Sequence, residues 1–213
     1  MSALPPRWLH LVRHGETALS GTGVIAGRLD VPLSARGEEQ ARAAARALRA
    51  RSLAAVVSSP LSRARATAEL VAAPHGLAVE IEPDLRELDF GVAEGLTFDE
   101  LERLHPEVAA TWLARPHEVV FPGGEGRDDI AARVVRAAHA IAARHPRGEC
   151  AVVSHAGPIR VLLGLARRLE PGAALALPCA HGSVASVGPY HGDFGVDLGV
   201  ALREPDEPDD AVS

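Results

Sequence analysis

The stretch Leu9-His10-Leu11-Val12-Arg13-His14-Gly15-Glu16-Thr17 places an arginine and a histidine where a short apolar run ends. A second histidine follows another apolar run, in Ala151-Val152-Val153-Ser154-His155-Ala156-Gly157. Short, continuous apolar runs are typical of buried parallel strands. In open α/β sheets, ligands bind beyond the carboxyl ends of the strands. We therefore expect Arg13, His14 and His155 to lie together at one rim of a sheet.

Predicted strands and helices alternate along the rest of the chain. Further strands are expected at residues 54–57, 79–81 and 184–187, the last of them internal, with an edge strand at residues 194–202. Helices are expected from an N-cap at Ser34 to about Arg51, from Ser59-Pro60 to about Ala73, from about Asp128 to His145, and from about Pro158 to Leu169. This alternation indicates an α/β fold, a three-layer α/β/α sandwich with a mostly parallel central sheet.

The segment from Arg86 to Pro122 departs from this alternation and is interpreted as an insertion, with a small helical lid at about residues 91–122. Thr97 and Glu100 have the spacing of a capping box, and His105-Pro106 is expected to separate two short helices. We predict a single domain over residues 1–202. An acidic, proline-broken tail at residues 203–213 is predicted to be disordered.

The composition argues against several classes of protein. A net charge of −6 and an aromatic content of 3% argue against a nucleic-acid partner. All 22 basic residues are arginine, so no lysine can form a Schiff base or serve a P-loop. Two cysteines are too few for a disulfide framework. No run approaches the roughly 18 apolar residues of a membrane span, and the first residues lack the apolar core of a signal peptide, so we expect a cytoplasmic protein with no membrane partner.

Two arginines and two histidines are candidates for a phosphate-binding pocket. Arg63 lies near the start of the helix after the second predicted strand, at the same rim as Arg13, His14 and His155. Arginine forks match phosphate oxygens and would hold a dianion without a metal ion or cofactor. A neutral His14 imidazole could attack phosphorus and form a phosphohistidine, which splits one difficult step into two. Neighbouring arginines lower the pKa of His14 and so favour this neutral form.

A proton donor must also reach the oxygen of the leaving group. Glu16, Glu87 and Glu94 are the candidates, and Glu87 follows a strand in the apolar context Leu85-Arg86-Glu87-Leu88. Such a setting raises the pKa of a carboxyl group toward neutrality, as a general acid requires. On spacing alone, a solvated loop charge is an equally good interpretation of Glu87.

Five segments together resemble the histidine phosphatase superfamily, also called phosphoglycerate mutase-like proteins. The resemblance covers roughly residues 9–187. It is carried by Leu11-Val12-Arg13-His14-Gly15-Glu16-Thr17, Asp30-Val31-Pro32-Leu33-Ser34-Ala35-Arg36-Gly37, Ser58-Ser59-Pro60-Leu61-Ser62-Arg63-Ala64, Leu85-Arg86-Glu87 with Phe90-Gly91, and Ser154-His155-Ala156-Gly157. The resemblance implies a phosphoglycerate mutase-like fold with His14 as the phosphorylated nucleophile. It further implies Arg13, Arg63 and His155 as phosphate ligands and Glu87 as the proton donor and acceptor.

The chain departs from the family pattern in the first loop and in the lid. Ser20 and Ala26 stand where many members carry asparagine and glutamine. Together with Gly27 and Ala156, they are expected to line the substrate pocket. Ala93 replaces a common tryptophan, which suggests a more open lid.

Three other residues are weaker candidates for the same rim. Arg28 follows Gly27 and could contact substrate, although such an arginine is more often exposed. His181 and His191 could also approach the rim.

We predict a metal-independent phosphomonoesterase for a small phosphorylated metabolite. Phe121-Pro122-Gly123-Gly124-Glu125 and His181-Gly182-Ser183-Val184 resemble α-ribazole phosphatases and their broad-specificity relatives. Alternatives within the family are a phosphoglycerate mutase, which the absence of lysine disfavours, a sugar bisphosphatase and a protein phosphohistidine phosphatase. Alternatives from other classes are a zinc hydrolase built from His14, Glu87 and His155, and a non-catalytic phosphate-binding module. The oligomeric state stays open and includes a homodimer.

Overall fold

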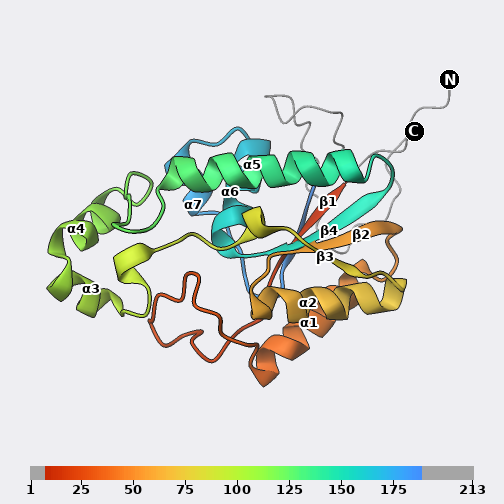
Figure 1. Cartoon of the computed structure of the whole chain (residues 1–213), viewed down its shortest axis with the longest axis horizontal. Coiled ribbons are helices and arrows are strands. Elements are labelled where there is room, and N and C mark those ends of the chain that lie inside the picture. The colour runs from red at the N-terminus through yellow and green to blue at the C-terminus, as the bar shows by residue number, and fades with distance from the viewer. Residues whose placement is uncertain (1–7, 189–213) are drawn as a thin grey trace.

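The computed structural model describes residues 8–188, and its centre is a five-stranded sheet (Figure 1). The strands are β1 (Leu9–Arg13), β2 (Leu53–Ser58), β3 (Val79–Ile81), β4 (Glu149–Ser154) and β5 (Val184–Val187). They lie in the order β3-β2-β4-β1-β5. All pairs are parallel except β1 with β5, which is antiparallel. The predicted, mostly parallel sheet is confirmed.

Helices cover both faces of this sheet (Figure 1). One face carries α1 (Ala35–Leu48) and α2 (Ser62–Ala72), and the other carries α5 (Arg127–Arg144) and α6 (Ala156–Ala166). Side chains alternate along β1, so Leu9 and Leu11 pack with α5 and α6 whereas Val12 packs with α1 and α2. The short helix α7 (Pro171–Leu175) packs against α6. The arrangement is the predicted α/β/α sandwich.

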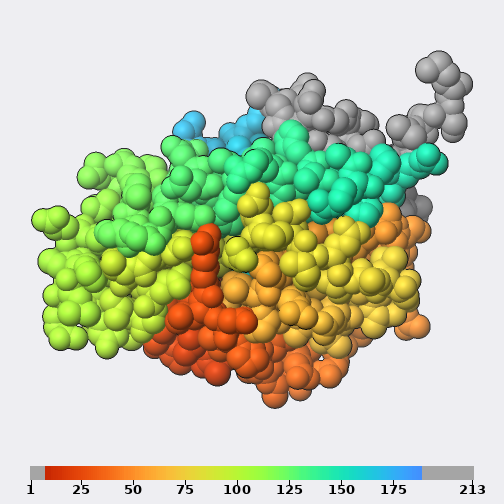
Figure 2. All heavy atoms as spheres, viewed as in Figure 1, coloured from red at the N-terminus to blue at the C-terminus, as the bar shows by residue number. Residues whose placement is uncertain are grey.

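The lid consists of α3 (Phe98–Leu104) and α4 (Pro106–Ala114), which lie to one side of the sandwich (Figure 1). The predicted capping box is present, because Thr97 Oγ1 accepts from Glu100 N and Glu100 Oε2 accepts from Thr97 N. The lid has its own apolar cluster, built around Leu101 and Phe121. Figure 2 shows the first loop (residues 14–34, red and orange) against the yellow-green lid, where Ile25 N donates to Leu96 O at 2.9 Å.

Two helices begin at other residues than predicted. Helix α2 starts at Ser62 rather than at Ser59-Pro60, because the chain is still extended at Leu61 and Ser59 N–H donates to Val153 O at 3.0 Å. Helix α6 starts at Ala156, two residues before Pro158. Pro158 lies in the first turn, where a missing N–H costs no intrahelical bond. The Ser34 N-cap of α1 is confirmed, since its side chain accepts from Gly37 N at 3.1 Å.

Short 3₁₀ helices lie between α2 and α3, at Ala73–His75, Pro83–Leu85 and Gly91–Ala93. Within residues 8–188, β5 is the last strand of the sheet on its side. The strand predicted at residues 194–202 and the acidic tail lie outside the described residues. No helix in the described part of the chain is both long and apolar enough to span a membrane.

Candidate active site

The predicted histidine cluster forms at the carboxyl ends of β1 and β4. These strands pair in parallel, with Arg13 opposite Ser154, and His14 N donates to Ser154 O at 3.0 Å. The ring centroids of His14 and His155 are consequently 4.9 Å apart. The rim predicted from two apolar runs is confirmed.

The hydrogen bonds of His14 define its tautomer. Its Nδ1 lies 2.7 Å from the carbonyl oxygen of Gly15, which can only accept, so Nδ1 carries the proton. Its Nε2 lies 3.2 Å from Nε of Arg63, which can only donate, so Nε2 presents a lone pair. Burial, and after it the charge of Arg63, lowers the pKa of His14 well below its ordinary value. The sequence predicted this direction but named only the arginines, whereas burial is the larger cause.

Arg63 is held between the first loop and α2. Its guanidinium is buried and donates to Gly27 O at 2.6 Å and to Leu29 O at 2.7 Å. Thr67 Oγ1, one turn later in α2, accepts from Gly15 N at 3.2 Å. These contacts fix the position of Arg63 relative to the loop that carries His14.

His155 and Arg13 each have a buried nitrogen with no hydrogen-bond partner among the described residues. His155 Nε2 is paired with Ser59 Oγ at 2.8 Å, whereas its Nδ1 is unpaired. Arg13 donates from Nη1 to Cys179 O and from Nη2 to His181 Nε2, whereas its Nε is unpaired. Buried polar atoms are nearly always paired, so unpaired ones are expected where a ligand completes the bonding. Burial, and after it the neighbouring His14, lowers the pKa of His155 well below its ordinary value.

Glu87 lies in the loop that follows β3 and is half-buried. Its Oε1 accepts from Leu88 N at 2.9 Å and from Gly157 N, in the first turn of α6, at 3.1 Å. Burial raises the pKa of Glu87, although these N–H groups and the charges of Arg63 and Arg13 act in the opposite direction. A carboxyl group with this environment is suited to proton transfer.

The two other acidic candidates are bonded within loops. Glu16 Oε1 accepts from Gln40 Nε2 at 2.9 Å. Glu94 Oε1 accepts from Arg28 N at 2.8 Å and from Phe90 N at 3.2 Å. Both carboxylates therefore serve to hold the chain around the site.

Comparison with known families agrees with this geometry. The model of branch 1 of the histidine phosphatase superfamily matches residues 9–199. The chain belongs to this superfamily. The resemblance inferred from the five sequence segments is thereby confirmed.

Several relatives of this histidine phosphatase are phosphatases. The chain is similar to phosphoserine phosphatase 1 of Hydrogenobacter thermophilus, with 36% identity over 154 residues that cover 72% of this chain and 73% of that protein. It is 43% identical over 162 residues to a bifunctional protein of Mycobacterium tuberculosis, covering 76% of this chain. The chain spans only 44% of the length of that relative.

Solved structures extend the comparison. A mycobacterial glucosyl-3-phosphoglycerate phosphatase has a TM-score of 0.80 at 30% identity and covers 92% of this chain and 96% of that one. The α-ribazole phosphatase of Shigella flexneri has a TM-score of 0.79 at 27% identity and covers 91% of this chain and 99% of that one. The family and these relatives support a phosphoric monoester hydrolase as the enzyme class.

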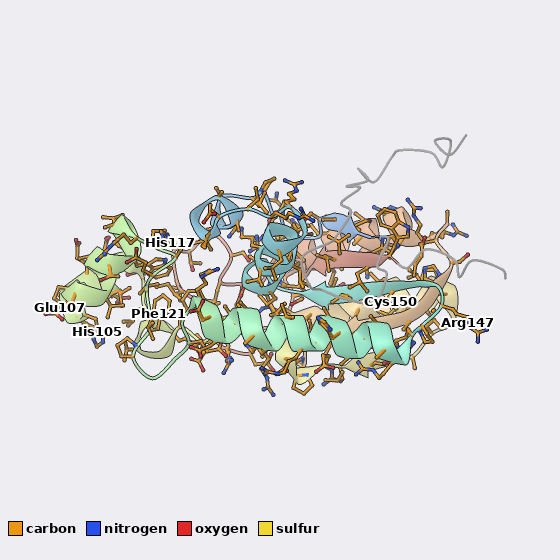
Figure 3. The ribbon with its side chains drawn as sticks, turned by 90° about the horizontal axis from the view of Figure 1, so that it is seen from above. His105, Glu107, His117, Phe121, Arg147 and Cys150 are labelled. Atoms are coloured by element: carbon orange, nitrogen blue, oxygen red, sulfur yellow. The ribbon has the colours of Figure 1, made fainter. Side chains whose placement is uncertain are left out.

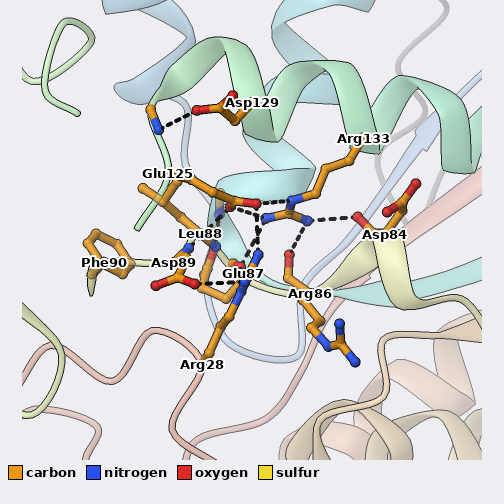
Figure 4. A network of polar contacts seen from close by, with 12 residues as sticks. Arg28, Asp84, Arg86, Glu87, Leu88, Asp89, Phe90, Glu125, Asp129 and Arg133 are labelled. Carbon is orange, nitrogen blue, oxygen red and sulfur yellow. Dashed lines mark hydrogen bonds and ion pairs between the residues drawn. The ribbon is translucent and has the colours of Figure 1, made fainter. Parts of the chain in front are cut away.

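A network of ion pairs that the sequence did not indicate supports the Glu87 loop of this histidine phosphatase (Figure 4). Arg133 on α5 is buried and forms two 2.9 Å bonds with the carboxylate of Glu125. It also donates to the carbonyl oxygen of Glu87 at 2.9 Å. Arg28 pairs with Asp89 and Glu125, each at 2.7 Å, so it ties the first loop to this network rather than standing exposed.

The remaining predicted pocket residues occupy different positions. Ser20 Oγ accepts from Thr17 N at 2.9 Å, and Ala26 O accepts from Leu29 N at 2.8 Å, so both stabilise turns of the first loop. Gly27 contributes its carbonyl to Arg63, and Ala156 is the first residue of α6. Their contact with substrate stays a prediction.

His181 belongs to the histidine cluster more fully than the sequence suggested. Its ring centroid lies 5.5 Å from that of His14, and its Nε2 is 3.0 Å from Arg13 Nη2. Burial, and after it the charge of Arg13, lowers the pKa of His181 to about 4. A neutral His181 accepts the bond from Arg13 and orients its guanidinium. His191 lies outside the described residues.

The zinc alternative required His14, Glu87 and His155 to converge as metal ligands. Within residues 8–188, no group of three or more histidine, cysteine, aspartate or glutamate side chains is arranged to hold a metal ion. The positive charge of Arg63, whose Nε donates to His14 Nε2, would also repel a metal cation at this position.

Proposed function

We propose that the chain is a metal-independent phosphomonoesterase that hydrolyses a small phosphorylated metabolite through a phosphohistidine on His14. The observation that carries this proposal is the hydrogen bonding of His14, which directs an unprotonated Nε2 toward the guanidinium of Arg63. A nucleophile beside a fixed cation can attack a phosphoryl group whose charge that cation stabilises.

In the first step, the Nε2 lone pair of His14 attacks phosphorus and the bond from phosphorus to the alcohol oxygen breaks. The protonated carboxyl of Glu87 gives its proton to that oxygen, which leaves as the alcohol. Arg13, Arg63 and His155 hold the other phosphoryl oxygens, and the unpaired nitrogens of Arg13 and His155 provide donors for them.

In the second step, water attacks the phosphohistidine and gives a proton to the Glu87 carboxylate. The nitrogen–phosphorus bond breaks, and neutral His14, protonated Glu87 and inorganic phosphate are restored. No oxidant, reductant or metal is required for this cycle.

The names of the relatives refer to substrates with different alcohol groups. Their names refer to phosphoserine, glucosyl-3-phosphoglycerate and α-ribazole phosphate, which differ in size and polarity. What supports a small phosphorylated metabolite is the family and the buried cluster of His14, Arg63 and His155 at the rim.

The test is hydrolysis of p-nitrophenyl phosphate by the native protein and by His14→Ala, with and without EDTA. We expect EDTA-resistant turnover in the native protein, no turnover in the variant, and an acid-labile phosphoryl adduct on His14 by mass spectrometry after rapid quenching. Turnover that EDTA abolishes, or that persists in His14→Ala, would contradict the mechanism. Phosphate transfer to a second hydroxyl instead of to water would indicate the mutase.

A further inference from the structure

A cavity of about 250 Å³ lies between the lid and helices α5, α6 and α7. Its lining includes Glu87, Ala156 and Gly157, which are the proposed proton donor and the two residues after His155. Figure 3 shows two further lining residues, His117 and Phe121, on the connection from the lid to the start of α5. The cavity therefore borders both the proposed acid of the histidine cluster and the lid.

The walls of this cavity are mostly apolar. The lid side is a cluster of aromatic rings, in which Phe121 packs against Phe90 and Trp112 with centroids 4.9 and 5.1 Å apart. The opposite side includes Val161 and Leu165 of α6. Four of the chain's seven aromatic residues lie in this lid cluster, in a protein that uses aromatic residues sparingly. Among the described residues, the charged or ionisable groups that line it are Glu87, His117, Arg127 and Arg160.

From this geometry we infer that the cavity binds the alcohol part of the substrate, and that this alcohol is predominantly apolar, either alkyl or aromatic. The inference rests on the proposed function and narrows its substrate class. The oxygen that leaves must lie within hydrogen-bond reach of Glu87, so the carbon chain attached to that oxygen starts at Glu87. Glu87 also lines the cavity, whose other walls include apolar side chains of the lid and α6.

Polar alcohols are disfavoured by the same walls. A sugar or glycerate hydroxyl placed against Phe121, Trp112 or Leu165 would lose its bonds to water without gaining a partner. An alkyl or aryl group would gain from leaving water, by up to about fourfold in binding for each buried methylene.

The experiment uses the intact chain and alkyl phosphates whose leaving groups have nearly the same pKa, namely the ethyl, propyl, butyl and hexyl esters. Glycerol 3-phosphate serves as the polar counterpart of propyl phosphate. We expect kcat/KM to rise at least about tenfold from ethyl to hexyl phosphate, and propyl phosphate to be preferred over glycerol 3-phosphate.

Two neighbouring alanines of α5 provide a matched pair of variants. Ala131 lines the cavity, whereas Ala132 is exposed. Ala131→Phe should reduce the hexyl-to-ethyl ratio of kcat/KM at least fivefold, and Ala132→Phe should leave that ratio at the native value. Equal ratios in the two variants would overturn the assignment.

The native protein alone also decides the question. If it hydrolyses ethyl phosphate through His14 but shows no increase with chain length, or prefers glycerol 3-phosphate, the assignment of the cavity is wrong and the proposed function stands. If it hydrolyses none of these esters and does not hydrolyse p-nitrophenyl phosphate, the assignment of the cavity and the proposed function are both wrong.

Discussion

Replacing Arg133 by methionine is expected to destabilise the protein strongly, because this side chain joins the Glu87 loop to α5 (Figure 4). Its guanidinium binds both carboxylate oxygens of Glu125 at 2.9 Å. It donates to the carbonyl oxygens of Asp84 at 2.7 Å, Arg86 at 2.6 Å and Glu87 at 2.9 Å. Methionine fills a similar volume but donates no hydrogen bond, so the carboxylate and the three carbonyls lose the donors that Arg133 supplies.

The magnitude follows from the burial of the pair. The side chains of Arg133 and Glu125 are 7% and 17% exposed. Breaking such a pair from one side costs about 3–5 kcal/mol in the free energy of unfolding. Since Glu125 retains a 2.7 Å contact with Arg28, we expect the lower end of this range, about 3 kcal/mol. For a chain of this size that corresponds to a fall in Tm of roughly 6–12 °C.

Arg136→Met is the matched control on the same helix. Arg136 also pairs with the Glu87 loop, through Asp84 Oδ2 at 3.3 Å, but its side chain is 65% exposed. Exposed pairs contribute about 0–1 kcal/mol, so its loss should be small. Urea and thermal unfolding followed by circular dichroism at pH 7 measure both variants. Equal losses of 1 kcal/mol or less in the two variants would refute the reasoning from burial.

Three further predictions follow from the same contacts. Burial raises the pKa of Glu87, and a general acid works in its protonated form, so kcat/KM for alkyl phosphates should fall as the pH rises through that raised pKa. In Glu87→Gln, kcat/KM should fall about 10²- to 10⁴-fold on ethyl phosphate but far less on p-nitrophenyl phosphate, whose leaving group needs no proton. Equal losses on the two substrates would contradict the role of Glu87 as the acid. His181→Leu removes the acceptor for Arg13 and should lower kcat/KM about tenfold, whereas His181→Asn keeps an acceptor and should lose less; identical rates in the two variants would show that the bond to Arg13 is unimportant. Burial acts to raise the pKa of Glu125, but hydrogen bonds and charge from Arg133 hold this pKa below its ordinary value. The stabilising effect of the ionised Glu125 carboxylate is therefore present above the unfolded pKa of about 4.3 and is lost as the pH falls through the folded pKa. The native protein should therefore lose more stability than Arg133→Met between about pH 5 and 3 in urea titrations, and parallel pH profiles would contradict this.

The parts of the fold that could be predicted from the sequence are those set by neighbouring residues. The Ser34 cap and the capping box at Thr97 are local signals, and both are confirmed. The rim could be predicted because parallel strands end at one edge, which brings His14 and His155 together whatever the rest of the chain does.

The contacts that could not be predicted join residues far apart in the chain. His181 reaches Arg13 across 168 positions, and the sequence made it only a weaker candidate for the rim because no local signal predicts its contact with Arg13. Arg133 is one of 22 arginines, and its role depends on the path of the Glu87 loop rather than on its own helix. The start of α2 differs from the prediction for a related reason, since Ser59 is hydrogen-bonded to Val153 of β4 and to His155, which are distant in the sequence.

The site has two parts that differ in how readily the backbone opens locally, because one part adjoins the central strand β4 and the other lies on a loop. The amides of β4 are bonded to β1 on one side and β2 on the other, and both apolar cores cover it, so they should exchange with solvent only on global unfolding. Glu87, in contrast, lies on a loop held by the side chains of Arg133 and Arg28. Local opening of that loop and the lid would release the alcohol while the two histidines stay in register.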